Sequence, residues 1–79
     1  MQEVVLRGVI KYSKKINGTY RFMFIDFNNE HRSMVFKTTR MLAEEIDEKY
    51  LNRLVEITYR PARGNEIPLA VRVSLLKQN

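Results

Sequence analysis

The chain has 79 residues, no cysteine and a formal net charge of +5 at pH 7. Its length suits one domain, so we expect residues 1–79 to form a single domain. The absence of thiols excludes disulfides, thiolate metal sites and a cysteine nucleophile. Because small extracellular domains usually depend on disulfides, we expect a cytoplasmic location. No apolar stretch reaches the ~18 residues of a membrane span, and no signal-peptide pattern opens the chain.

The charge is unevenly distributed along the chain. The segment Met41–Tyr50 contains four carboxylates and one lysine, a local charge of −3, so the other residues together carry +8. We therefore expect a basic body with an acidic helix, which would attract a polyanion to one part of the surface and repel it from another.

Five strand-like runs and one helix-like run can be placed in the sequence. The strands are predicted at 3–12, 18–27, 31–38, 53–60 and 67–76, and the helix at 40–51. A single helix between the third and fourth of five strands is typical of the oligonucleotide/oligosaccharide-binding barrel, the OB-fold. The predicted fold class is therefore all-β with one helix, a five-stranded OB-fold barrel. An SH3-like barrel is the main alternative, and the long helix argues against it.

The first strand predicts one face toward the core and one toward solvent. Gly8 in mid-strand predicts a bend or bulge. Ser13 to Gly18 reads as the first turn, with Asn17-Gly18 favouring a tight hairpin. The inward set is Val4, Leu6, Gly8, Ile10 and Tyr12, and the outward set is Val5, Arg7, Val9 and Lys11.

The second strand is apolar on both faces, which a half-buried strand should not be. One set is Tyr20, Phe22, Phe24 and Asp26, and the other is Arg21, Met23, Ile25 and Phe27. The aromatic set could fill the core or form a binding platform, and both readings stay open. The apolar second face could be covered by a ligand, a partner subunit or another strand. From it we expect a homo-oligomer.

Later elements give clearer facing predictions. Thr38 or Thr39 is expected to cap the helix, whose apolar face is Leu42, Ile46 and Tyr50. Predicted inward residues on the last three strands are Met34, Phe36, Val55, Ile57, Tyr59, Leu69, Val71, Val73 and Leu75. Predicted outward residues there are Ser33, Val35, Lys37, Leu54, Glu56, Thr58, Arg60, Ala70, Arg72 and Ser74.

Catalytic and metal-binding patterns are missing from the sequence. His31 is the single histidine, and the three glycines form no phosphate-binding loop. The scattered carboxylates do not show metal-ligand spacing. We therefore expect a protein that is not an enzyme and uses no cofactor or metal.

Basic and aromatic residues point instead to single-stranded nucleic acid, which proteins bind with cations along the backbone and flat side chains under the bases. The bases are predicted to lie across the second and third strands, between basic first and last loops. The candidate binding residues are Arg7, Lys11, Lys14, Lys15, Tyr20, Arg21, Phe22, Lys37, Arg60, Arg63 and Arg72.

With this strand order, aromatic second strand and pair of basic loops, the chain resembles compact OB-fold single-stranded-DNA-binding proteins. These include the bacterial and phage single-strand-binding proteins and the primosomal replication protein B type. The resemblance is architectural, covers nearly the whole chain and implies a role in DNA replication. The family's acidic tail has no counterpart in the ending Leu75-Leu76-Lys77-Gln78-Asn79. This difference favours a minimal binding module from a phage or mobile element.

Two other functions remain open. The doubly apolar second strand, or the exposed Val5, Val9 and Leu54, could form a protein-interaction surface of an assembly module or a phage-encoded adaptor or inhibitor. The aromatic strand also loosely resembles the platform of RNA-binding cold-shock proteins. We expect single-stranded DNA, with little sequence preference, as the partner, with RNA as the alternative.

Overall fold

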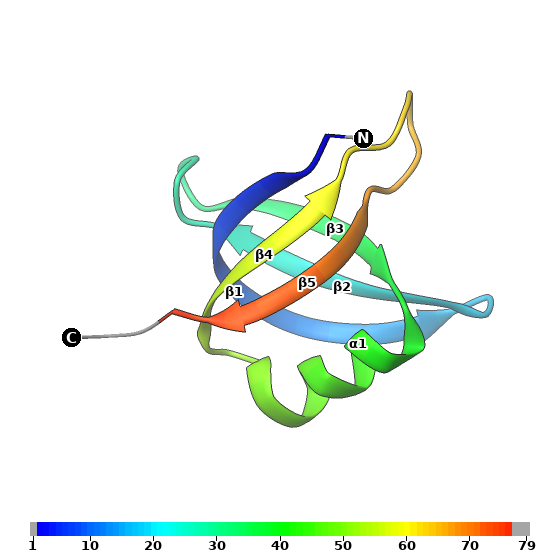
Figure 1. The fold of residues 1–79 in the computed structure, drawn as a ribbon, viewed down its shortest axis with the longest axis horizontal. Helices are drawn as coiled ribbons and strands as arrows, with labels where there is room; N and C mark the ends of the chain where they lie inside the picture. The colour runs from blue at the N-terminus through cyan, green and yellow to red at the C-terminus, as the bar shows by residue number, and fades with distance from the viewer. Residues whose placement is uncertain (1, 77–79) are drawn as a thin grey trace.

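The computed structural model describes residues 2–76 and shows a closed barrel of five strands with one helical segment (Figure 1). The strands are β1 (Val4–Ile16), β2 (Thr19–Asp26), β3 (Arg32–Thr38), β4 (Leu54–Arg60) and β5 (Leu69–Leu75). Around the barrel they follow the order β1-β2-β3-β5-β4. Between β3 and β4, helix α1 (Arg40–Glu45) continues into the π-helical turn η1 (Ile46–Tyr50). The predicted fold class and element order are confirmed, and the architecture is compatible with an OB-like fold.

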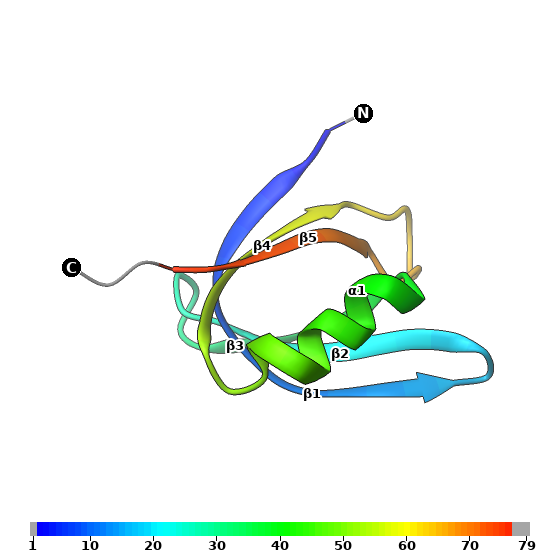
Figure 2. The same ribbon diagram turned by 60° about the horizontal axis from the view of Figure 1, so that its bottom comes forward.

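Strand β1 belongs to both halves of the barrel. Its first part pairs antiparallel with β4 as far as Val9, and its second part pairs antiparallel with β2 as far as Ile16. The end of β1 and the start of β2 therefore form a hairpin that projects beyond the rest of the barrel (Figure 2).

The predicted first turn is shorter than expected. The strand continues through Ile16, and only Asn17 and Gly18 form the turn, with φ of 49° and 79°. Positive φ at both central residues is the requirement of the tight hairpin turn whose twist matches that of the strands. The tight turn at Asn17-Gly18 is confirmed, whereas the loop assignment of the preceding residues, including Lys14 and Lys15, is wrong.

A β-bulge lies in β1 at Lys11, not at Gly8 as predicted. The pairing with β2 passes from Ile10 opposite Phe24 to Tyr12 opposite Met23, so Lys11 is the extra residue. A bulge adds one residue to a strand of period two, so side chains beyond it point to the opposite face. Tyr12 is consequently 42% exposed, and its predicted inward position is wrong.

Gly8 has a different role, because the backbone of β2 comes very close to it. A Cβ at this position would lie 1.8 Å from the carbonyl oxygen of Ile25. Glycine is therefore required by close approach of two strands rather than by a bulge.

The barrel interior is filled mainly by three phenylalanines and by aliphatic residues. Phe22 stacks on Phe36 with ring centroids 5.4 Å apart, and Phe24 meets Phe36 edge-on at 6.0 Å. Of the two readings of the second strand, the structure supports the core reading for Phe22 and Phe24. The buried apolar cluster is Ile10, Phe22, Phe24, Phe36, Ile46, Val55, Ile57, Ala70 and Val73.

A second bulge changes the facing of β5. Thr58 pairs with Arg72 and Tyr59 with Ala70, which leaves Val71 as the extra residue. Ala70 and Thr58, predicted outward, are buried, and Leu75, predicted inward, is 40% exposed. As with Lys11, a single unpaired residue reverses the alternation, and Ala70 therefore faces the core. The bulge does not account for Thr58, which lies on β4, or for Leu75, which shares a face with the buried Val73.

The helical segment packs its apolar side against one end of the barrel. Thr39 caps α1, its side-chain oxygen accepting a hydrogen bond from the amide of Leu42 at 3.2 Å. Leu42 and Tyr50 pack on the core around the buried Ile46, as predicted. Ser13 of β1 donates a hydrogen bond to the carboxylate of Asp47. Within residues 2–76 no helix combines the length and apolar character needed to cross a membrane.

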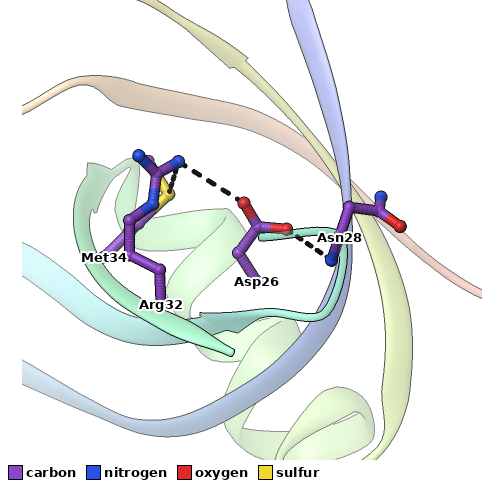
Figure 3. A network of polar contacts seen from close by, with 4 residues as sticks. All are labelled: Asp26, Asn28, Arg32 and Met34. Carbon is purple, nitrogen blue, oxygen red and sulfur yellow. Dashed lines mark hydrogen bonds and ion pairs between the residues drawn. The ribbon is translucent and has the colours of Figure 1, made fainter. Parts of the chain in front are cut away.

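A small polar network orders the connection between β2 and β3 (Figure 3). The buried carboxylate of Asp26 accepts the amide of Asn28 at 3.0 Å and lies 3.4 Å from a guanidinium nitrogen of Arg32. The same nitrogen lies 3.3 Å from the sulfur of Met34. The buried charge thus has both a hydrogen-bond donor and an opposite charge, which offsets its loss of hydration.

Candidate nucleic-acid interface

Three strands present two parallel rows of side chains on the outside of the barrel. In the first row, Lys14 of β1 lies opposite Arg21 of β2, which lies opposite Lys37 of β3. Directly opposite residues share a face of a sheet, so the three cations point the same way. We call these three residues the cation row. Neighbouring strands are about 4.8 Å apart, so the cation row extends over roughly 10 Å.

The second row is apolar and lies two residues away from the cation row on each strand. Tyr12 is opposite Met23, and Met23 is opposite Val35. We call these three residues the apolar row. Tyr12 and Val35 are 42% and 44% exposed. The Nζ of Lys14 lies 5.1 Å from the centre of the Tyr12 ring, so the aromatic and a cation are already in contact.

A cavity of about 170 Å³ lies where the two rows meet. Its walls come from both rows, from Ile16 at the end of β1 and from the buried Phe22 beneath. The exposed part of this lining is apolar with cations at one side, which suits a flat, partly polar group attached to an anion.

The last loop, which joins β4 to β5, meets the cation row at Lys37. The amide of Lys37 donates to the carbonyl of Pro68 at 3.0 Å. Asn65, Glu66 and Ile67 line a hollow together with Arg21 and Lys37. Glu66 lines this hollow, but it forms no ion pair with Arg21 or Lys37 in the part of the chain that is described.

The cations of the row have no carboxylate partner among residues 2–76. Like charges directly opposite each other on a sheet destabilise it. The Nε of Arg21 is shielded from solvent and has no hydrogen-bond partner within the described residues. Three neighbouring cations of this kind lower the stability of the fold and favour the binding of an anion.

Tyr20 and Lys15 lie on the other side of the hairpin from the cation row. They are opposite each other, the Nζ of Lys15 is 5.4 Å from the Tyr20 ring, and Tyr20 is opposite the buried Thr38. Since successive side chains alternate between faces, Tyr20 and Arg21 cannot contribute to one surface of β2. Of these two predicted binding residues, only Arg21 therefore lies on the face of the cation row.

Phe22 must also be removed from the predicted site. It is 1% exposed and stacked on Phe36, so it has no face free for a base. The physical reason is the small size of the barrel, which needs the large aromatics as core.

Three predicted arginines lie on the β1–β4–β5 side and have acidic partners. Arg7 is 3.2 Å from Glu56, while Arg60 and Arg72 are 3.5 Å and 3.7 Å from the two carboxylate oxygens of Glu3. They are not brought together with the cation row, and their charge is partly compensated. Lys11 is exposed at the bulge, and Arg63 is exposed in the last loop beside Gly64.

Tyr12, Met23 and Val35 were not among the predicted site residues. Met23 and Val35 were visible as outward apolar positions in the alternation of their strands. Tyr12 could not be placed, because its direction depends on the bulge at Lys11. The sequence around Lys11 does not signal the bulge. The bulge arises from the curvature that β1 needs to pair with both β4 and β2.

The predicted homo-oligomer stays a prediction. Met23 and Ile25, two of the residues that suggested it, are half-buried within the single chain. The apolar second face of β2 therefore depends less on a partner subunit than its sequence indicates.

Comparison of the sequence with protein-family models gives no match, and comparison with the curated proteins gives none either.

Proposed function

We propose that the protein binds single-stranded nucleic acid, DNA in the first place, on the outer face of β1, β2 and β3. The observation that carries this proposal is the pairing of an unpartnered cation row with an apolar row that contains an exposed aromatic. Single-strand-binding proteins combine a basic track for the backbone with stacking platforms for the bases.

The two rows suggest how a strand would lie. Its phosphates would follow the cation row across the three strands, where roughly 10 Å accommodates about two to three phosphate groups. Its bases would point toward the apolar row, and one of them would stack on Tyr12 at the cavity between the rows. Stacking on an aromatic ring is tolerant of base identity, so sequence preference would be weak.

The charge distribution supports the same face. The acidic residues Glu44 and Glu48 of the helical segment are exposed away from the cation row, and the cations of the β1–β4–β5 side are compensated by Glu3 and Glu56. A polyanion is therefore drawn to the uncompensated cations of β1, β2 and β3.

Fluorescence anisotropy with a labelled single strand, a duplex of equal length and an RNA strand tests the proposal. We expect single strands to bind more tightly than duplex, and affinity to fall with salt. The cation row and Arg63 offer about three to four phosphate contacts, so the log–log slope should be about −2 to −3. Duplex preference, or affinity that does not change with salt, would contradict the proposal.

A further inference from the structure

The second half of β1 has a free edge. Pairing of β1 with β4 ends at Val9, and beyond it only an isolated bridge joins Ile10 to Leu51. From Tyr12 to Ile16 the strand pairs with β2 on one side and with no described strand on the other. In Figure 2 this part of β1 forms the border of the projecting hairpin.

The unpaired backbone groups can be assigned from the turn. In a two-residue hairpin the residues that flank the turn, Ile16 and Thr19, form a hydrogen-bonded pair, and bonded and non-bonded pairs then alternate. Lys14 and Tyr12 therefore direct their N–H and C=O groups toward β2. Ser13 and Lys15 direct theirs to the free edge, where a further strand could bond to them.

The side chains at this edge decide which strand fits. Lys14 and Lys15 are exposed on opposite faces of the hairpin, and Lys11 is exposed at the bulge. Lysines on an edge oppose pairing with another copy of the same strand, because equal charges would meet. The same lysines favour a strand that carries carboxylates. Ser13 differs, because its side chain donates a hydrogen bond to the carboxylate of Asp47. That carboxylate would repel an acidic residue opposite Ser13.

We propose that the free edge of β1 accepts an extended acidic peptide segment of a partner protein as an additional antiparallel strand. The segment would place acidic residues opposite Lys14 and Lys15, a small uncharged residue opposite Ser13, and apolar residues opposite Tyr12 and Ile16. Its backbone would exchange hydrogen bonds with Ser13 and Lys15. The edge shares Lys14 with the cation row, but its unpaired backbone groups belong to Ser13 and Lys15, so the proposal does not depend on nucleic-acid binding.

A peptide with capped ends and the central residues Val-Glu-Glu-Thr-Val tests the proposal. In the antiparallel alignment its first Glu lies opposite Lys15 and its Thr opposite Ser13. One analogue carries N-methyl groups on these two amides, and a matched analogue carries them on the amides of the two Val residues, which point away from β1. NMR titration of the labelled protein follows the binding of each peptide and the hydrogen exchange of the Ser13 and Lys15 amides.

We expect the parent peptide and the Val-methylated analogue to bind and to slow exchange at Ser13 and Lys15, and the other analogue to bind at least about tenfold more weakly. Equal binding of both analogues would show attraction by charge alone and would overturn the proposal. So would shifts confined to other strands, or no shifts at about 1 mM peptide.

Two charge-reversed proteins complete the test. Lys14→Glu with Lys15→Glu should weaken binding of the parent peptide at least about fivefold, because two cross-strand attractions become repulsions. Arg60→Glu with Arg72→Glu changes the net charge equally at exposed positions of β4 and β5 and should leave the affinity unchanged. Equal loss in the two proteins would attribute the binding to net charge and overturn the edge assignment.

Discussion

Tyr12 lies directly opposite Met23 on the outside of the barrel, although regular alternation from Ile10 would turn Tyr12 into the core. The bulge at Lys11 causes the reversal and thereby places an aromatic ring beside Lys14. This one unpaired residue brings an aromatic into contact with the cation row, which is the combination that the proposed function requires.

Tyr12→Ala should weaken single-strand binding by about 1–3 kcal/mol, the contribution of one stacked base, with little change in stability. Phe27→Ala is the matched control, because Phe27 is also 42% exposed but lies at the turn after β2. Titration of both variants with the same labelled strand measures the difference. Equal affinities of the two variants would rule out Tyr12 as the stacking residue.

Phe22→Ala should act on stability rather than on binding. Removing a fully buried aromatic from a packed core costs about 3–5 kcal/mol, a large part of the stability of a small domain. Urea unfolding followed by circular dichroism gives the change. A stable Phe22→Ala protein with reduced affinity for single strands would instead show that Phe22 contributes to the binding surface.

Gly8→Ala should destabilise the barrel by about 3 kcal/mol, because the added Cβ overlaps the backbone of β2 and neither strand can move without breaking its pairing. Gly64→Ala is the comparison. Its φ is +59° but no atom lies within 4 Å of the added Cβ, so only backbone strain of about 1–2 kcal/mol is expected. Thermal unfolding should rank the variants in this order, and the reverse order would contradict the close approach at Gly8.

Self-association is expected to use the β1–β4–β5 side, where Val5 is 51% exposed and the half-buried Val9 lies opposite Leu54 on the same outer face. Exposed apolar side chains beside each other favour an interface between copies. Val5→Asp should then lower the sedimentation coefficient measured at high protein concentration, while Val35→Asp on the opposite side should not. Sedimentation as a monomer at every concentration would contradict the predicted homo-oligomer.

The order of elements was predictable because it depends on local signals. The Asn17-Gly18 turn and the Thr39 cap are chemical requirements that a few residues reveal, and Leu42, Ile46 and Tyr50 define a helix face by their spacing. These signals suffice for the strand–strand–strand–helix–strand–strand order.

Side-chain direction was less predictable, because it is counted residue by residue along a strand and one unpaired residue shifts the count. The bulge at Lys11 turned Tyr12 to the outside and the bulge at Val71 turned Ala70 to the inside, so both residues were assigned to the wrong face. The ion pairs were also not predictable from the sequence. Glu3 and Glu56 meet Arg60, Arg72 and Arg7 only because β1, β4 and β5 are adjacent in the barrel.

The salt dependence of single-strand affinity in two pairs of variants tests the proposed interface most directly. Lys14→Ala and Lys37→Ala each remove one cation of the row, so each should lower the affinity and reduce the magnitude of the log–log salt slope by about 0.7. Arg7→Ala and Arg72→Ala remove the same charge from the β1–β4–β5 side and should leave the slope unchanged. Slopes that fall equally in all four variants, or only in the arginine variants, would contradict binding at the cation row.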